Sequence, residues 1–226
     1  MGLVIYEWVS YATFALALWW ALRSRDPLCL GALLGGALLF AFDWMWCSRA
    51  FFNATFARQL TPIPGLHIPG QRYPIAVVAN WAVGFGFLPY LLSLAHGSLS
   101  SRLGVLHYPV IFLVGLLYDA AAEISLVSGL GVYTYHQAPE YLVAGVPWSN
   151  SWFLANTVAL GYFALAYARR WAALPDRNGF DPSREETWKG LLMPAGALFA
   201  VFVLLTVVQL FWYSAVTPWV DAGRAF

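Results

Sequence analysis

The chain has 226 residues, of which 61% are hydrophobic and only 10% are charged. A soluble domain carries roughly 25% charged residues, so this composition indicates a polytopic protein of the lipid bilayer. The net charge of +1 and the single lysine, Lys189, argue against a surface that binds nucleic acid. Because membrane spans bury their polar groups by packing on each other, we expect one transmembrane domain over residues 1–226.

Six apolar stretches reach the length of about 20 residues that an α-helix needs to cross a bilayer. In chain order they are Leu3–Leu22, Leu28–Cys47, Tyr73–Ala95, Val105–Leu130, Ser151–Ala168 and Gly190–Ser214. The first stretch lacks the basic segment and the A-x-A cleavage site of a secretory signal, so we expect it to be retained as a span. The predicted fold class is an all-α transmembrane helical bundle with about six spans.

The connections between these spans are of two kinds. Three are polar and predict solvated loops: RSRDP at 23–27, HGSLSSR at 96–102 and LPDRNGFDPSREE at 174–186. The other two, Arg49–Arg72 and Gly131–Asn150, mix aromatic residues, proline and glycine with few charges. Non-helical backbone at a membrane needs protein partners, so we expect both of these loops to fold over one mouth of the bundle.

Lysine and arginine are distributed unevenly between the two sides of such a bundle. The side that holds both termini carries four of them: Arg49, Arg58, Arg72 and Arg224. The other side carries eight: Arg23, Arg25, Arg102, Arg169, Arg170, Arg177, Arg184 and Lys189. Because cytoplasmic loops are enriched in lysine and arginine, the second side is predicted to be cytoplasmic and both termini are predicted to be non-cytoplasmic.

Two acidic residues lie inside the fourth span. Asp119 and Glu123 are four residues apart and therefore share one helical face, although a central charge costs about 2.5–3.5 kcal/mol to insert. Each of the remaining five spans also has a polar residue, and the alternating direction of the helices places all of them in the same half of the bilayer. These residues are Glu7, Asp43, Asn80, Asn156 and Gln209. This convergence predicts a polar cavity under the two aromatic loops, lined also by tryptophans such as Trp44 and Trp81.

Each of these residues also has a purely structural interpretation. Glu7 and Asp43 are near span ends and can reach the interface, and the amides can serve as hydrogen-bonding groups between helices. Asp119 and Glu123 can form a buried ion pair with Arg49 or Arg58. His67 and His136 lie in the loops, where a histidine is more often a surface residue than a catalyst.

The types of residue favour acid–base chemistry without a cofactor. A buried carboxylic acid can donate a proton near neutral pH, a second carboxylate can accept one, and aromatic faces stabilise a cation. We predict Glu123 as general acid or base, Asp119 as its partner and Asp43 as a second carboxylate across the cavity. Haem, di-iron and retinal proteins are disfavoured because no span has a central histidine or lysine. Cys29 and Cys47 do not form a metal motif.

Two stretches resemble a known family. DWMWCSRAFFNATF (Asp43–Phe56) and YDAAAEISLVSGLGVYTY (Tyr118–Tyr135) are similar to the AveC-type spirocyclase family of bacterial membrane proteins, over about residues 40–165. That family acts on spiroketal-forming polyketides by cyclisation and sometimes dehydration. The D-x3-E pattern followed by G-x-Y-x-Y is also similar to membrane carotenoid hydratases and small membrane terpene cyclases. The positions that match are Asp43, Asn53, Asp119, Glu123, Tyr133 and Tyr135.

The resemblance implies a bacterial inner-membrane enzyme that cyclises, dehydrates or hydrates a lipophilic polyketide or isoprenoid. Together with the predicted cavity, it gives a set of residues expected to bind substrate: Tyr133, Tyr135, Asn53, Asn80, Asn156, Trp44, Trp81 and Gln209. The alternative is a non-catalytic subunit of a larger membrane complex, or a small transporter, in which the carboxyl groups form a structural pair or a proton path. Homo-oligomerisation is compatible with either class.

Overall fold

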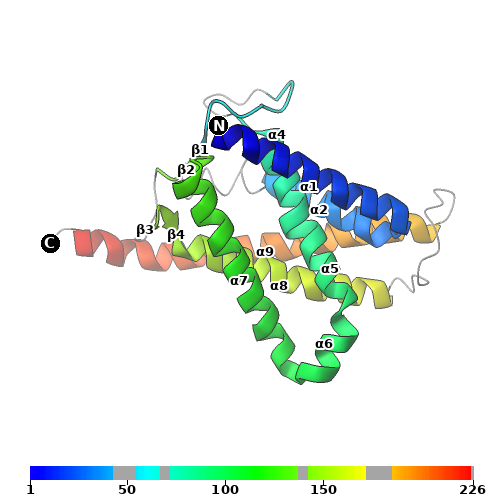
Figure 1. Ribbon diagram of the computed structural model, residues 1–226. Helices are drawn as coiled ribbons and strands as arrows, with labels where there is room; N and C mark the ends of the chain where they lie inside the picture. Colours follow the sequence, from blue (N-terminus) through cyan, green and yellow to red (C-terminus); the bar gives the residue numbers. More distant parts are fainter. Residues whose placement is uncertain (43–53, 67–71, 137–141, 172–184, 225–226) are drawn as a thin grey trace.

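The computed structural model describes residues 1–42, 54–66, 72–136, 142–171 and 185–224 (Figure 1). Most of this part of the chain is helical. Four helical segments are long and apolar enough to cross a membrane: Gly2–Ser24, Ile75–Leu94, His96–Gly129 and Trp188–Trp212. The prediction of a membrane protein built as a helical bundle is therefore supported, whereas the number of spans stays a prediction.

The first two helices are joined by a short turn. Helix α1 (Gly2–Ser24) ends at Arg25, which adopts a left-handed conformation with a φ of 53°. Asp26 then accepts a hydrogen bond of 3.0 Å from the backbone N–H of Leu28 and so caps helix α2 (Pro27–Phe42). Proline suits the first position of a helix because its missing N–H would have no partner there. The described part of the predicted span Leu28–Cys47 is helical, and its last five residues lie outside the described ones.

The third span contains a π-helical segment. Helix α4 (Ile75–Trp81) passes into η2 (Ala82–Phe87) and then into α5 (Leu88–Leu94). The segment η2 includes Gly84 and Gly86. Short π segments interrupt α-helices at strained or functional places.

The prediction of a loop at 96–102 is wrong. Residues His96–Leu103 form helix α6, which continues through η3 (Gly104–Leu106) into α7 (His107–Ile124) and a second π segment, η4 (Ser125–Gly129). The hydroxyl groups of Ser100 and Ser101 donate hydrogen bonds to the backbone carbonyls of Gly97 and Ser98, three residues earlier, which is compatible with a helix. Helices α5 and α7 both pack on α8, whereas the α6 end of their hairpin extends beyond the other helices (Figure 1).

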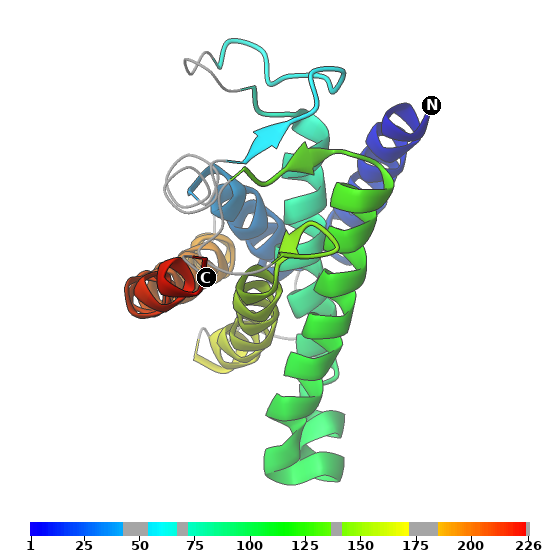
Figure 2. The ribbon, with the colours of Figure 1, turned by 90° about the vertical axis from the view of Figure 1, so that its left-hand side faces the viewer.

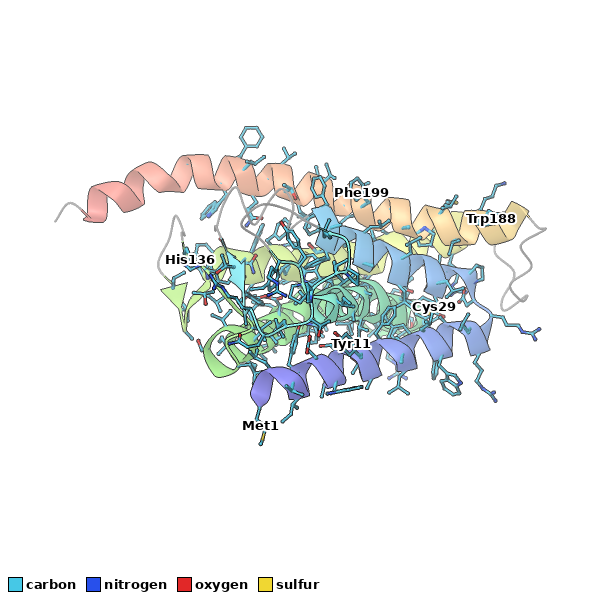
Figure 3. All side chains as sticks on the ribbon, turned by 90° about the horizontal axis from the view of Figure 1, so that it is seen from above. Met1, Tyr11, Cys29, His136, Trp188 and Phe199 are labelled. Carbon is cyan, nitrogen blue, oxygen red and sulfur yellow. The ribbon has the colours of Figure 1, made fainter. Side chains whose placement is uncertain are left out.

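Two long helices complete the bundle. Helix α8 covers Trp148–Trp171, and helix α9 covers Glu185–Arg224. Helix α8 lies between α7 and α9 (Figure 2) and packs on both. Seen from above, α1 and α9 lie at opposite edges of the molecule with the other helices between them (Figure 3).

Small residues allow α2 to approach its neighbours closely. A Cβ atom on Gly31 would lie 2.3 Å from the carbonyl oxygen of Leu191 in α9, and one on Gly36 would lie 2.8 Å from the backbone nitrogen of Gly86 in η2. A Cβ atom on Gly86 would in turn lie 2.2 Å from the carbonyl oxygen of Ala32. Glycine contacts of this kind are typical of membrane helices, whose association depends on close van der Waals packing.

The two aromatic loops meet, as the sequence predicted. Strand β1 (Thr55–Phe56) comes from the first loop and pairs antiparallel with β2 (Tyr133–Thr134) from the second, with Thr55 opposite Thr134. The second loop continues into a small hairpin of β3 (Leu142–Val143) and β4 (Val146–Pro147). Its turn residues, Ala144 and Gly145, both have positive φ, which suits the twist of a two-residue hairpin.

Candidate functional site

Asp119 and Glu123 lie on the buried face of α7. Helix α7 buries four residues spaced four apart, namely Ile111, Gly115, Asp119 and Glu123. Both carboxyl groups therefore point into the protein and not to its surface: the exposed fraction is 3% for Asp119 and 7% for Glu123. Gly115 brings this face close to α8, because a Cβ atom there would lie 3.1 Å from the carbonyl oxygen of Ala155.

Glu123 is held by two phenols from the loop that follows its own helix. Tyr133 donates a hydrogen bond to Oε1, and Tyr135 donates one of 2.8 Å to Oε2. The side chain of Asn150 at the start of α8 donates to the hydroxyl of Tyr135 at 3.0 Å. The extended backbone around β2 places alternate residues, Tyr133 and Tyr135, on one side, which explains how both reach the same carboxyl group.

The phenol of Tyr133 remains a proton donor. Burial raises its pKa well above the ordinary value, and the adjacent Glu123 raises it further. A raised pKa keeps the hydroxyl group protonated at neutral pH, so Tyr133 donates its hydrogen bond and Glu123 accepts it. Two donated hydrogen bonds stabilise the carboxylate form of Glu123.

Asp119 has a different environment. Its Oδ2 atom is buried and has no hydrogen-bond partner among the described residues. The hydroxyl of Ser151, on α8, lies close enough to interact with the same carboxyl group. The hydroxyl of Tyr6 on α1 is also buried. It lies close to Ser10 of the same helix and near enough to Glu123 to interact electrostatically. Unpartnered buried oxygens are rare, and they mark a place where a bound molecule can supply the missing hydrogen bond.

A continuous run of aromatic rings connects the roof to the helices below. Tyr133 contacts Phe56 with ring centroids 5.7 Å apart, Phe56 contacts Phe40 at 6.3 Å, and Phe40 contacts Trp81 at 6.0 Å. Trp81 is only 8% exposed and also packs on Phe202 of α9. Trp81 therefore belongs to the aromatic core under the roof, at the far end of this run from Glu123.

A cavity of about 250 Å³ lies between the start of α8 and α9. Its lining residues are Trp148, Ser149, Trp152, Val208, Gln209 and Trp212. Gln209 lies beside this cavity, where its neighbours are tryptophans, and not beside the carboxyl groups with which it was expected to share a cavity. Ser149 precedes Asn150, so the backbone that lines this cavity also carries the amide that supports Tyr135.

The structure separates the remaining predicted residues from the carboxyl pair or leaves them undescribed. Asn156 accepts a hydrogen bond of 3.0 Å from Tyr108 of α7 and donates one to the carbonyl oxygen of Trp152, so it connects two helices. Asn80 is half-buried and makes no hydrogen bond to any described residue. The predictions for Asp43, Trp44 and Asn53 fall outside the described residues.

Two structural alternatives can be compared with the observed contacts. In the described part of the chain, neither Asp119 nor Glu123 forms an ion pair, and the guanidinium of Arg72 donates to the backbone carbonyl of Arg58. Pairing with Arg49 concerns an undescribed residue. Glu7 has a structural role, because its Oε1 accepts a hydrogen bond of 2.6 Å from the backbone N–H of Thr61 and fixes the first loop to α1.

Sequence reasoning missed three residues of the site. Asn150 and Ser151 stood at the boundary between a loop and a span, and only their consecutive polar side chains at the start of α8 gave a signal. Tyr6 was one aromatic residue among many in α1. The described residues include no group of three or more histidine, cysteine or acidic side chains arranged to hold a metal ion.

No family model, curated protein or solved structure matches this chain. The fold and the site define only a class of protein, and the comparisons assign no family. The class is a helical membrane protein with a buried pair of carboxyl groups beneath two paired loops.

Proposed function

We propose that this protein is an integral membrane enzyme that cyclises, dehydrates or hydrates a lipophilic polyketide or isoprenoid by acid–base chemistry. The observation that carries the proposal is the asymmetry of the buried pair. Glu123 accepts hydrogen bonds from two phenols, whereas Oδ2 of Asp119 has no partner among the described residues. Two carboxyl groups whose environments differ in this way are suited to opposite roles in proton transfer.

In this proposal Asp119 is the acid and Glu123 is the base. The carboxylic acid of Asp119 gives its proton to a substrate hydroxyl oxygen. The C–O bond then breaks, water departs, and a carbocation or oxocarbenium ion is formed on the substrate. A second hydroxyl group of the substrate then attacks the cation, or a neighbouring carbon loses a proton, and the carboxylate of Glu123 accepts that proton. Hydration is the reverse sequence. The rings of Tyr133 and Tyr135 stabilise the cation through their faces.

The surroundings of the pair suit a greasy substrate. Substrate reaches the pair from the bilayer, and the cavity between α8 and α9 accepts an apolar part of it against Trp148, Trp152 and Trp212. The paired loops exclude water above the site, which protects a cationic intermediate from capture. No step in this chemistry oxidises or reduces the substrate.

We further propose six spans with both termini on the non-cytoplasmic side of a bacterial inner membrane. This arrangement adds α2 and α8 to the four segments that are long and apolar enough by themselves. It is supported by the excess of arginine on the opposite side, where α1 ends and α8 ends.

The test compares lipophilic extracts of source cells that express wild type, Asp119→Asn or Glu123→Gln. Liquid chromatography with mass detection should show a product that disappears in both variants while its precursor accumulates. The precursor is heavier than the product by one water for cyclisation or dehydration, and lighter by one water for hydration. Glu7→Gln is the matched control, because it also neutralises a membrane carboxyl group but keeps an acceptor for Thr61. Identical extracts from wild type and both variants, with the proteins folded, would exclude the proposal.

A further inference from the structure

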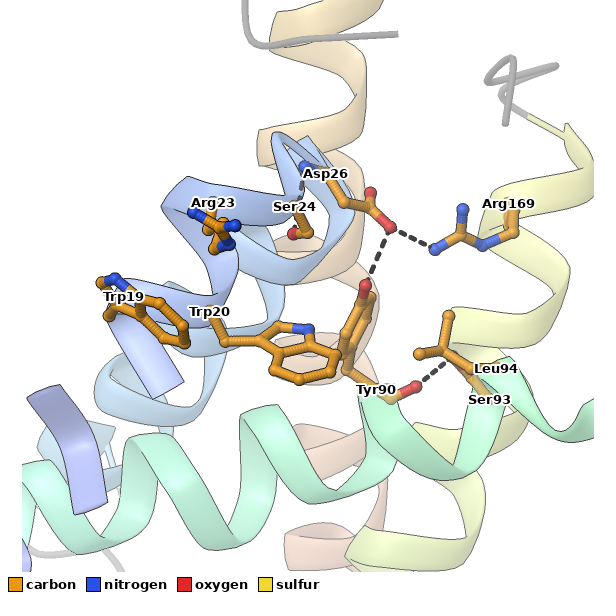
Figure 4. A pocket seen from close by; sticks show the side chains of 9 residues that line it. All are labelled: Trp19, Trp20, Arg23, Ser24, Asp26, Tyr90, Ser93, Leu94 and Arg169. Carbon is orange, nitrogen blue, oxygen red and sulfur yellow. Dashed lines mark hydrogen bonds and ion pairs between the residues drawn. The ribbon is translucent and has the colours of Figure 1, made fainter. Parts of the chain in front are cut away.

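A second polar cavity lies at the end of the bundle where α1, α5 and α8 finish. It has a volume of about 890 Å³ and is independent of the carboxyl pair. Its lining residues are Trp19, Trp20, Arg23, Ser24, Asp26, Tyr90, Ser93, Leu94 and Arg169 (Figure 4). The last turns of two candidate spans, Gly2–Ser24 and Ile75–Leu94, contribute to it, so it lies at the depth where lipid headgroups meet water.

Three of the lining residues, Asp26, Tyr90 and Arg169, form a hydrogen-bonded cluster. Asp26 is buried, and its Oδ2 accepts hydrogen bonds of 2.5 Å from the guanidinium of Arg169 and 2.9 Å from the hydroxyl of Tyr90. Ser93 donates to the backbone carbonyl of Tyr90 at 2.7 Å. The two contacts of Asp26 join the start of α2 to α5 and α8 and fix the position of Arg169.

One positive charge in the lining is not neutralised. The two arginines carry two positive charges and Asp26 carries one negative charge, so the lining has an excess of one. Arg23 forms no ion pair with a described residue, and its guanidinium lies over the ring of Trp19, 5.7 Å from the centroid. Figure 4 shows Arg23 and Arg169 on opposite sides of Asp26. An anion in the cavity can therefore approach Arg23 while Arg169 remains fixed.

Two tryptophans give the cavity an apolar border. Trp19 is 56% exposed and Trp20 is 47% exposed, both in the last turns of α1. Tryptophan at the ends of spans is typical of the interface between headgroups and acyl chains. A soluble anion would not need this border, whereas a phospholipid places its phosphate near the arginines and its acyl chains along the tryptophans.

We propose that this cavity binds the phosphate group of an anionic phospholipid. Arg23 provides the charge that selects an anionic headgroup over a zwitterionic one. Basic pockets between membrane helices bind lipid headgroups in this way. The site is separate from the carboxyl pair, so the proposal holds whether or not the protein is an enzyme.

The experiment measures lipid binding to the full chain in a neutral maltoside detergent by native mass spectrometry. Phosphatidylglycerol and phosphatidylcholine with identical acyl chains are titrated separately, and inorganic phosphate is titrated as a third ligand. We expect wild type to bind phosphatidylglycerol more tightly than phosphatidylcholine. Arg23→Gln should lower the affinity for phosphatidylglycerol about five-fold. This corresponds to the contribution of about 1 kcal/mol that one arginine makes near a membrane surface.

Arg25→Gln is the control, since it removes a charge from the same turn but does not line the cavity. It should leave the preference for phosphatidylglycerol nearly unchanged. Equal losses in Arg23→Gln and Arg25→Gln, or equal binding of the two lipids by wild type, would overturn the proposal. Displacement of phosphatidylglycerol by millimolar inorganic phosphate would identify a site for soluble phosphate and would overturn the lipid assignment.

Discussion

At the scale of single residues, the structure assigns different partners to acidic side chains that look alike in the sequence. Glu7 holds a loop through the N–H of Thr61, and Asp26 caps a helix and pairs with Arg169. Glu123 accepts from two phenols, and Asp119 keeps one oxygen without a described partner. Burial without a cationic partner distinguishes the last two from the structural carboxyl groups.

Replacing Tyr135 by phenylalanine should destabilise the protein by about 1–3 kcal/mol, the usual cost of losing a hydrogen bond to a buried charged or polar group. Tyr135→Phe removes one donor from Glu123 and leaves the side-chain amide of Asn150 without its partner. The midpoint of thermal unfolding in detergent, followed by circular dichroism, measures this loss.

Tyr11→Phe is the control for that measurement. The hydroxyl of Tyr11 also faces a glutamate, Glu7, but at 3.5 Å and in a half-buried position, so its loss should change stability by no more than about 0.5 kcal/mol. Equal unfolding midpoints for Tyr135→Phe and Tyr11→Phe would show that the phenols do not hold Glu123.

At the scale of elements, close contacts through glycine determine how α2 packs. Gly31 faces α9, and Gly36 faces the π segment η2. The repeat of small residues in GALLGG was visible in the sequence, but the partner of each glycine was not. A helix with small residues on several faces can pack on any neighbour, and only the assembled bundle selects which one.

Gly86→Ala should destabilise the bundle by about 1–3 kcal/mol or more, because overpacking forces backbones apart. The added Cβ atom would lie 2.2 Å from the carbonyl oxygen of Ala32. Both atoms belong to helical backbone, in η2 and α2, so relieving this clash requires the two helices to move apart. Gly97→Ala, in helix α6, is a matched change with no atom within 4 Å, so it should be neutral or slightly stabilising. Thermal unfolding of both variants under the same conditions gives the comparison, and equal midpoints would contradict the packing argument.

At the scale of the whole molecule, the position of α2 decides the topology. If α2 crosses the membrane, Arg25 before it and Arg58 after it lie on opposite sides. Single cysteines at these two exposed positions, in a background with Cys29 and Cys47 replaced by alanine, can be labelled with a membrane-impermeant maleimide on intact spheroplasts. We expect Arg58→Cys to react at once and Arg25→Cys to react only after permeabilisation. Labelling of both from the same side would show that α2 does not span.

The helical bundle was largely predictable from the sequence. Apolar stretches of the right length can only satisfy their backbone groups in a membrane as helices, so Gly2–Ser24, Ile75–Leu94 and Trp188–Trp212 follow closely from the predicted spans. The helix at His96–Leu103 was not predictable in this way, because its serines and glycine resemble a loop and its stability depends on continuity with α7. That Asp119 and Glu123 share one helical face followed from their spacing alone, whereas their burial is seen only in the structure.

The tertiary structure decided which groups meet. Thr55 pairs with Thr134, and Arg169 reaches Asp26, although in each case the two residues are far apart in the chain. Asn150 reaches Tyr135 in the second aromatic loop, while Asn156, only six residues later, connects α8 to Tyr108 of α7. The sequence by itself determined that polar groups had to be buried inside an apolar bundle, because periodicity assigns a residue to a face. It did not determine their partners, because the rotation and crossing of helices depend on close packing between surfaces that are formed only when the bundle assembles.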